Sequence, residues 1–256
     1  LNQNAALFLE VNMGGTAIGT GINADPEYPA LVIKHLRAIT GLDVSLAANL
    51  VEATQDTGAF VMYSSAIKRL ALKLSKICND LRLLSSGPRA GLNEINLPPM
   101  QPGSSIMPGK VNPVIPEVVN QIAFKVIGND LTVSLAAEAG QLELNVMEPV
   151  IVQSLMESIE MLRNGMDTLN HRCVSGITAN ARRCREMVEN SIGLVTALNP
   201  VLGYEKCTIL AKEALENDRS VYDLVLEKAY LSKEALDDLL KPENMIGFQP
   251  MKVKRS

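Results

Sequence analysis

Tryptophan is absent from this sequence, and aromatic residues make up only 4% of its 256 residues. Its apolar side chains are therefore mostly Leu, Ile, Val, Ala and Met, which suit packed helices better than a β-sandwich. The chain also lacks any run of about 18 apolar residues and shows no secretory signal, so we expect no membrane span.

Basic clusters and histidines are equally scarce. The net charge is −4, and the basic cluster at Lys252, Lys254 and Arg255 resembles a solvated terminus, so we expect no nucleic-acid partner. His35 and His171 stand far apart from each other, and only Cys173 lies close to one of them, two residues after His171. The sequence therefore predicts neither a metal site nor a histidine-based catalytic triad, and it suggests no cofactor.

The four cysteines, Cys78, Cys173, Cys184 and Cys207, form no CxxC pair. Cys78 and Cys207 lie among apolar residues of helical spacing, where a buried free thiol is the usual finding. We expect all four to be reduced, which favours a cytoplasmic protein.

Three long segments carry apolar residues four and three positions apart, the pattern of a helix-bundle seam. The residues are Tyr63, Ile67, Leu70, Leu74, Ile77, Leu81 and Leu84; Ile115, Val119, Ile122, Val126 and Val133; and Ile151, Leu155, Ile159, Leu162, Met166 and Leu169. Helices of this length, about 30–45 Å, predict an all-α bundle. Leu72, Leu83, Val118 and Ile127 add apolar flanks, so we expect burial on more than one side and a homo-oligomer.

The pattern changes after Val174, where helical segments become shorter and more charged. We expect helices at 181–191, 206–216, 221–230 and 233–240, with interruptions at Asn199-Pro200, Gly203 and Pro242. The sequence thus predicts a central helix-bundle domain over residues 1–173 and a small helical domain over 174–256. Within the first, residues 5–12 look helical, and 26–41 predict one short helix with turns.

A stretch without periodicity, residues 85–111, separates the first two long helices. It is rich in Gly and Pro but also holds apolar residues such as Leu92, Ile95 and Ile106. Long loops in compact domains are usually functional or disordered, and this apolar content argues against disorder. We therefore place an active-site loop at 98–112.

The end of this loop leads into a helix. Asn112-Pro113 resembles an N-cap followed by a first-turn proline, and Glu117 would complement the helix dipole. The free N–H groups and positive end of such a helix favour an anion. Two hydroxyls, Ser104 and Ser105, and one cation, Lys110, precede it. The same residues also fit a plain linker with a solvated lysine and an ordinary cap.

The segment GSSIMPGKVNP, residues 103–113, resembles the shared GSSxMPxKxN motif of the fumarase/aspartase superfamily. EVNMGGTAIGTGIN, AAEAGQLELNVMEPVI and GITANARRCREMVENSIGLVTALNP are similar to the same family, so the resemblance covers nearly the whole chain. Fumarases usually have Glu where this chain has Gln101, and a Thr-Gln-Cys-Glu-like run where it has residues 114–117. The resemblance therefore favours the branch that eliminates ammonia from L-aspartate to give fumarate.

The resemblance also implies roles for single residues. Ser104 matches the general base that removes the Cβ proton, and Ser105, Lys110 and Asn112 match groups that hold the carboxylates of the dicarboxylate substrate. Glu117 matches a carboxylate behind the site, which pairs with a catalytic histidine in fumarase-like members. The family forms tetramers in which each active site takes residues from three subunits.

Other blocks typical of the family, including its N-terminal substrate loops, have no counterpart here. We expect this chain to be a fragment of a longer lyase and to be inactive alone. The alternatives are a fumarate hydratase or another lyase of the superfamily, and a non-enzymatic helical oligomer kept for its bundle.

Overall fold

The structure, a computed structural model, describes residues 1–103, 107 and 109–245. It divides into two compact units, Leu1–Thr178 and Ala179–Ser256. Over the described residues, no helix combines the length and the apolar character needed to cross a membrane.

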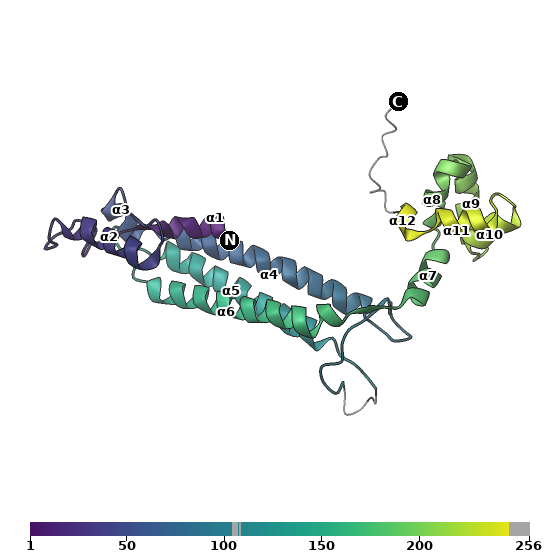
Figure 1. Cartoon of the computed structure of the whole chain (residues 1–256), viewed down its shortest axis with the longest axis horizontal. Helices are drawn as coiled ribbons and strands as arrows, with labels where there is room; N and C mark the ends of the chain where they lie inside the picture. The colour runs from purple at the N-terminus through teal and green to yellow at the C-terminus, as the bar shows by residue number, and fades with distance from the viewer. Residues whose placement is uncertain (104–106, 108, 246–256) are drawn as a thin grey trace. The chain divides into compact units, whose positions relative to one another are not determined.

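Three long helices dominate the first unit: α4 (Gly58–Leu84), α5 (Val114–Glu138) and α6 (Glu148–Arg172). Figure 1 shows them lying nearly parallel, and α5 packs along both α4 and α6. The predicted all-α helix-bundle fold is thus confirmed, and the three long seams of the sequence correspond to its three helices.

Short elements complete this unit. They are α1 (Asn2–Ala5), η1 (Ala6–Leu9), β1 (Glu10–Val11), α2 (Tyr28–Thr40), β2 (Ser45–Leu46), α3 (Leu50–Gln55), β3 (Ile95–Asn96), η2 (Val174–Gly176) and β4 (Thr178–Ala179). The expected helix over 5–12 is wrong beyond Leu9: α1 and η1 make residues 5–9 helical, but Glu10 and Val11 leave the helical path to pair in parallel with Ser45 and Leu46. The predicted helix within 26–41 is confirmed as α2, which ends at Gly41 in a left-handed conformation.

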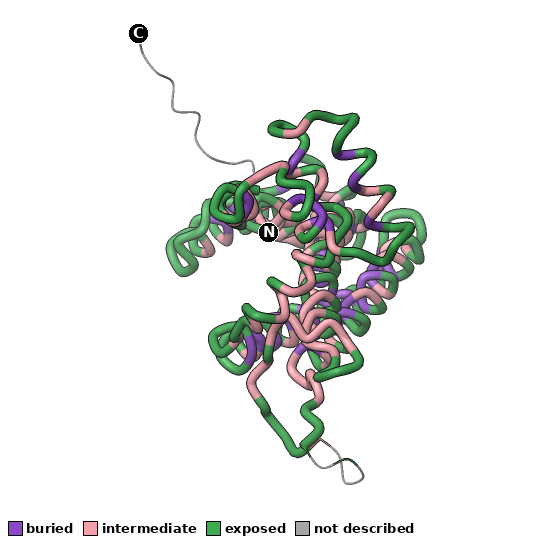
Figure 2. The backbone as a smooth tube through the Cα atoms, turned by 90° about the vertical axis from the view of Figure 1, so that its right-hand side faces the viewer, coloured by how far each residue is buried: buried purple, intermediate pink, exposed green. Residues whose placement is uncertain are grey.

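Small residues line the buried face of α4: Ser64, Ala71, Ser75 and Cys78 accompany Ile67 there. The predicted seam is partly wrong, since Ile77 is 47% exposed in this chain. Side chains this small permit a closely packed interface between α4 and α5, and Figure 2 shows the buried residues recurring along the helices. Some of the larger apolar residues of the predicted seam, such as Ile77, therefore lie outside the buried face of α4.

Two buried amides link the long helices. Asn120 of α5 donates to the Ser75 hydroxyl (2.9 Å) and to the Asn79 side chain (3.0 Å), while Arg82 donates to its carbonyl oxygen (3.2 Å). Asn129 donates to the Ser158 hydroxyl of α6 at 3.0 Å. Because a buried polar group without a partner is costly, these bonds favour one register of the helices.

The second unit is built from α7 (Ala181–Glu189), α8 (Leu194–Leu202), α9 (Tyr204–Glu216), α10 (Val221–Glu227), α11 (Lys233–Leu239) and α12 (Pro242–Met245). Its core gathers residues such as Leu198, Leu210, Leu224 and Leu236. The expected interruption at Asn199-Pro200 is wrong, because α8 continues through Pro200. Only one backbone donor is missing there, and the helix ends two residues later.

Candidate functional site

The long loop that contains the predicted active-site segment, 98–112, leaves α4 after Leu84 and enters α5 at Val114, at the end of the bundle where α6 also finishes (Figure 1). Its placement between two rigid helices follows from the sequence, since neither its prolines nor its glycines support a continuous helix. Its path is held by contacts at three places within the first unit.

The first contact folds the start of the loop back onto α4. The carbonyl of Leu84 accepts from the Glu94 amide at 2.9 Å, and the carbonyl of Ser86 accepts from Asn93 at 2.8 Å. Gly91 lies so close to Ser86 that an added Cβ would overlap the Ser86 carbonyl. The first ten residues of the loop therefore form a tight turn that no larger residue at position 91 would permit.

The second contact ties the middle of the loop to the end of α6. Asn96 donates to the Thr178 hydroxyl at 3.2 Å, and a Cβ on Gly176 would stand 2.6 Å from Cγ of Pro98. Residues 174–178, which the sequence assigned to the small domain, thus contact the site loop. This contact fixes the direction from which residues 98–112 depart.

The third contact brings the two sides of the motif together. The side-chain amide of Asn112 donates to the carbonyl of Gly103 at 2.7 Å. Lys110 passes so near Gly103 that a Cβ there would overlap the Lys110 carbonyl. We call Gly103, Lys110 and Asn112 the neck of the loop. Ser104 and Ser105, the predicted base and one predicted substrate-binding residue, lie outside the described residues.

The structure corrects the predicted start of α5. Asn112 is not its N-cap: Pro113 takes that position, and no side chain caps the helix. The expected row of free N–H groups is also largely missing, because Pro113 and Pro116 have none and Val114 donates to the Asn112 carbonyl at 2.9 Å. The helix dipole remains, so an anion here would depend on the dipole and on side chains such as Lys110.

Lys110 is exposed, and within the part of the chain that the structure describes its ammonium group has no hydrogen bond or ion pair. Glu117 lies in the first turn of α5 and is half-buried. The structure therefore brings Lys110 and Asn112 together at the neck, with Glu117 one turn into the helix. A solvent-facing cation at a helix start is suited to hold a carboxylate.

Arg82 and Asn120 are polar contributors near this loop that sequence reasoning missed. Arg82 stands in the last turn of α4, and Asn120 lies two turns into α5, so their hydrogen bond joins the helix ends between which the loop runs. The sequence signal that could have identified Asn120 was the presence of a polar residue directly beside the apolar seam of α5.

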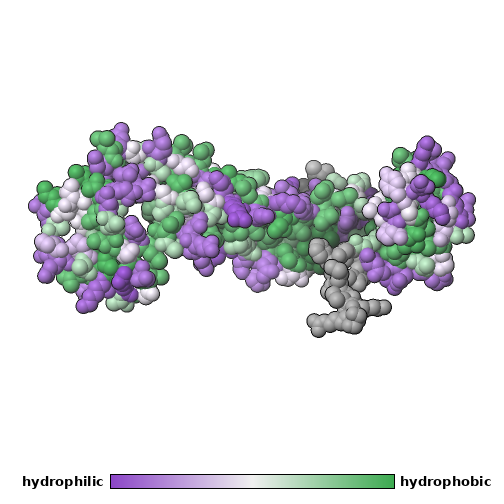
Figure 3. Space-filling view, turned by 90° about the horizontal axis from the view of Figure 1, so that it is seen from above, coloured by the Kyte–Doolittle hydropathy of each residue, from purple (hydrophilic) through white to green (hydrophobic). Residues whose placement is uncertain are grey.

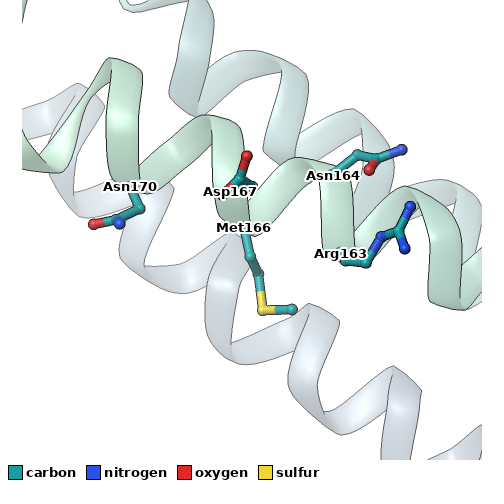
Figure 4. A pocket seen from close by; sticks show the side chains of 5 residues that line it. All are labelled: Arg163, Asn164, Met166, Asp167 and Asn170. Carbon is teal, nitrogen blue, oxygen red and sulfur yellow. The ribbon is translucent and has the colours of Figure 1, made fainter.

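A separate hollow of about 590 Å³ lies on α6, lined by Arg163, Asn164, Met166, Asp167 and Asn170. Figure 4 shows these side chains pointing in different directions rather than converging on one point. None of the predicted site residues lines it. Among described residues there is also no group of three or more His, Cys, Asp or Glu side chains that could hold a metal ion.

Comparison with known proteins places this geometry in a family. Residues 1–128 match the family model described as Lyase, and residues 194–247 match the one described as Fumarase C C-terminus. Aspartate ammonia-lyase of Helicobacter pylori is 65% identical over 238 residues, which is 93% of this chain and 51% of that protein. The chain thus spans about half the length of the curated relatives it matches.

Solved structures agree. Fumarate lyase:delta crystallin from Brucella melitensis bound to cobalt has a TM-score of 0.88 at 55% identity, covering 93% of this chain and 52% of that one. Class II fumarase from Schistosoma mansoni has a TM-score of 0.85 at 33% identity, covering 95% and 54%. The chain belongs to the lyase family of these proteins, the fumarase/aspartase superfamily.

Proposed function

We propose that the protein containing this sequence eliminates ammonia from L-aspartate to give fumarate. The support comes from relatives that carry the name aspartate ammonia-lyase and from the complete GSSIMPGKVN segment. The single observation that carries the proposal is the neck, where Lys110, a cation without an ion-pair partner among the described residues, follows the two motif serines closely in sequence.

The proposed chemistry starts with proton loss. Ser104 as an alkoxide takes the proton from Cβ, and the electron pair moves into the adjacent carboxylate to give an enediolate-like dianion. That pair then returns to form the carbon–carbon double bond as the Cα–N bond breaks and ammonia leaves with the bonding electrons. A serine can act as base only where its oxyanion is stabilised, so a nearby cation is required.

In the proposal Lys110 supplies the cation for both the serine oxyanion and the substrate carboxylate. Charge on the substrate carboxylate increases only after proton loss, so a fixed ammonium group there stabilises the transition state more than the ground state. Ser105 and Asn112 would hold the substrate carboxylates with hydrogen-bond donors. Glu117 would not touch the substrate itself but would orient a catalytic group supplied by another part of the complete enzyme.

We further propose a cytoplasmic homotetramer whose sites combine residues of several subunits, so that this chain alone is inactive. Exposed apolar side chains on α5, among them Phe124 and Leu131, support association. Free thiols at Cys78, Cys173 and Cys207 support a reducing compartment.

The proposed base is tested by Ser104→Ala in the longest gene product that contains this sequence. Removing a general base typically costs about 10²–10⁴-fold, so fumarate formation from L-aspartate, followed by its absorbance, should fall by at least that factor. Ser45→Ala, which changes an exposed serine in β2, is the matched control. Activity retained by Ser104→Ala with an unchanged circular dichroism spectrum would refute the assignment.

The proposed cation is tested separately by Lys110→Ala. Loss of one electrostatic stabiliser typically costs about 10²–10³-fold in kcat, so kcat/KM should fall at least as much. Lys34→Ala changes another exposed lysine, on α2, and should leave kcat/KM unchanged. Equal kcat/KM values for the two variants would remove Lys110 from the mechanism.

A fumarate hydratase is the second candidate, favoured by the fold shared with the Schistosoma mansoni fumarase. It differs only in the leaving group, water instead of ammonia. Parallel assays with L-malate and L-aspartate separate the two. A third candidate, a helical oligomer without activity, predicts stable association and no turnover of either substrate.

A further inference from the structure

Asn112 has an environment that neither a helix cap nor a substrate contact explains. Its amide nitrogen is directed across the loop to the carbonyl of Gly103, 2.7 Å away, and its own carbonyl accepts from the Val114 amide at 2.9 Å. The side chain is half-buried although the neighbouring Val111 and Lys110 are exposed. One residue thus connects the start of the motif, the end of the motif and the first turn of α5.

We propose that Asn112 is a positioning residue, which fastens Gly103 to the beginning of α5 and thereby fixes the place of Lys110. The importance of this for catalysis rests on the proposed function, but the fastening itself does not. Only eight residues separate Gly103 from Asn112 in the sequence, so closing the neck with one hydrogen bond carries a small entropic cost.

Gly103 gives independent geometric support. A Cβ at this position would overlap the backbone carbonyl of Lys110, and a backbone group cannot swing aside as a flexible side chain can. The two sides of the neck therefore approach as closely as main chains permit. Alanine at position 103 should separate them without changing any group able to touch a substrate.

The fastening also explains which role the sequence misassigned. Position 112 looked like a cap because Asn before Pro commonly is one, but Pro113 occupies the N-cap and the Asn112 amide is already used on Gly103. Among the described residues, the second hydrogen of this amide and its oxygen have no partner, so the hydrogen remains for a substrate carboxylate and the oxygen for another donor. Positioning and substrate contact are therefore compatible within one side chain.

Limited proteolysis of the substrate-free protein tests the fastening. Trypsin requires an extended, accessible backbone, and the Lys110–Val111 bond lies inside the neck. We expect Asn112→Ala and Asn112→Asp to raise the rate of cleavage after Lys110 about three- to tenfold, the effect of losing one typical hydrogen bond. The aspartate variant keeps the size of the side chain but cannot donate to Gly103.

Two references make the result specific. Arg89 lies in the first turn of the same loop, so cleavage after Arg89 should remain unchanged if only the neck opens. Asn217→Ala removes another amide that donates to a backbone carbonyl, that of Glu213 at 3.0 Å, in the second unit, and should not alter cleavage after Lys110. Gly103→Ala should accelerate cleavage after Lys110, and its effect should not add to that of Asn112→Ala.

Two results would overturn the proposal: unchanged cleavage after Lys110 in both Asn112 variants, or equal acceleration after Lys110 and Arg89, which indicates general loosening of the loop.

Steady-state kinetics provide a second measurement. Gly103→Ala and Asn112→Asp should both lower kcat, whereas pure substrate contact by Asn112 predicts a higher KM for the Asn112 variant and no effect at Gly103. An active Ser104→Ala variant would refute the proposed function and leave the proteolysis result intact.

Discussion

The Cys78 thiol shows how strongly the bundle interior differs from water. It is fully buried among Val119, Leu169 and Cys173. Burial first and the neighbouring Cys173 second raise the pKa of this thiol, against the opposing effect of Arg82, from its ordinary 9.0 to about 11. The native protein therefore keeps Cys78 neutral at pH values where an unfolded chain would already ionise.

This difference predicts a loss of stability at alkaline pH. The contribution of Cys78 is complete below pH 9 and falls as pH rises to about 11, because only the unfolded state loses the proton there. Two pKa units correspond to about 2–3 kcal/mol of unfolding free energy as an upper limit. Urea titrations at pH 8 and pH 10.5 should show a steeper decrease for the natural chain than for Cys78→Ala, and equal decreases would contradict the prediction.

At the scale of single residues, the sequence located the site segment but not the hydrogen bonds within it. Ser105, Lys110 and Asn112 of the motif were predicted to act together on the substrate carboxylates, and the structure places Lys110 and Asn112 at one neck. The direction of the Asn112 amide was not predictable, because the same Asn-Pro pair fits a helix cap and a cross-loop bond. Which one forms depends on Gly103, nine residues away.

Asn145 stands out among the elements because it joins two long helices at their common turn. It is 1% exposed, and its amide donates to the carbonyls of Ala136 (3.0 Å) and Ala137 (3.2 Å) at the end of α5. Its oxygen accepts from the Met147 amide at 2.8 Å, just before α6. One side chain therefore satisfies terminal groups of both helices.

Replacing Asn145 with alanine should destabilise the bundle by about 1–3 kcal/mol, because buried carbonyls lose their donors. Thermal and urea unfolding measure this loss. Asn164→Ala is the matched control, since Asn164 is exposed on α6 and no described residue forms a hydrogen bond with its side chain. Similar unfolding midpoints for the two variants would show that the Asn145 bonds contribute little.

At this scale the sequence was most informative for the long helices. The four–three spacing identified all three, since a buried stripe over many turns leaves a strong periodic signal. It failed for the contacts themselves, because Ala71 and Ser75 are buried while Ile77 is exposed, and large apolar residues dominate any spacing count. The spacing pattern could not predict the contact of the loop with residues 176 and 178 either, because that contact joins segments distant in sequence.

On the scale of the whole molecule, the first unit keeps much apolar surface outside its core. Phe124, Leu131 and Leu135 on α5 are each at least 60% exposed, and they follow one another along a helix with Gly128 in the same row. Figure 3 shows apolar surface mixed with polar surface along the bundle. Single exposed apolar residues are common on protein surfaces, but a continuous row of them along one helix favours an association surface.

We predict that this row joins copies of the protein. Leu131→Asp in the longest gene product that contains the sequence should shift the sedimentation velocity from that of the proposed tetramer toward smaller species, because a carboxylate would be buried without a partner. Leu215→Asp is the matched control: Leu215 on α9 is 70% exposed, but no large apolar residue lies one turn away on its helix. A tetramer unaffected by Leu131→Asp would exclude this row from the interface. If sites are shared between subunits, turnover should fall in proportion to the dissociated fraction and recover at high protein concentration, whereas sites complete within one subunit would keep their activity on dissociation.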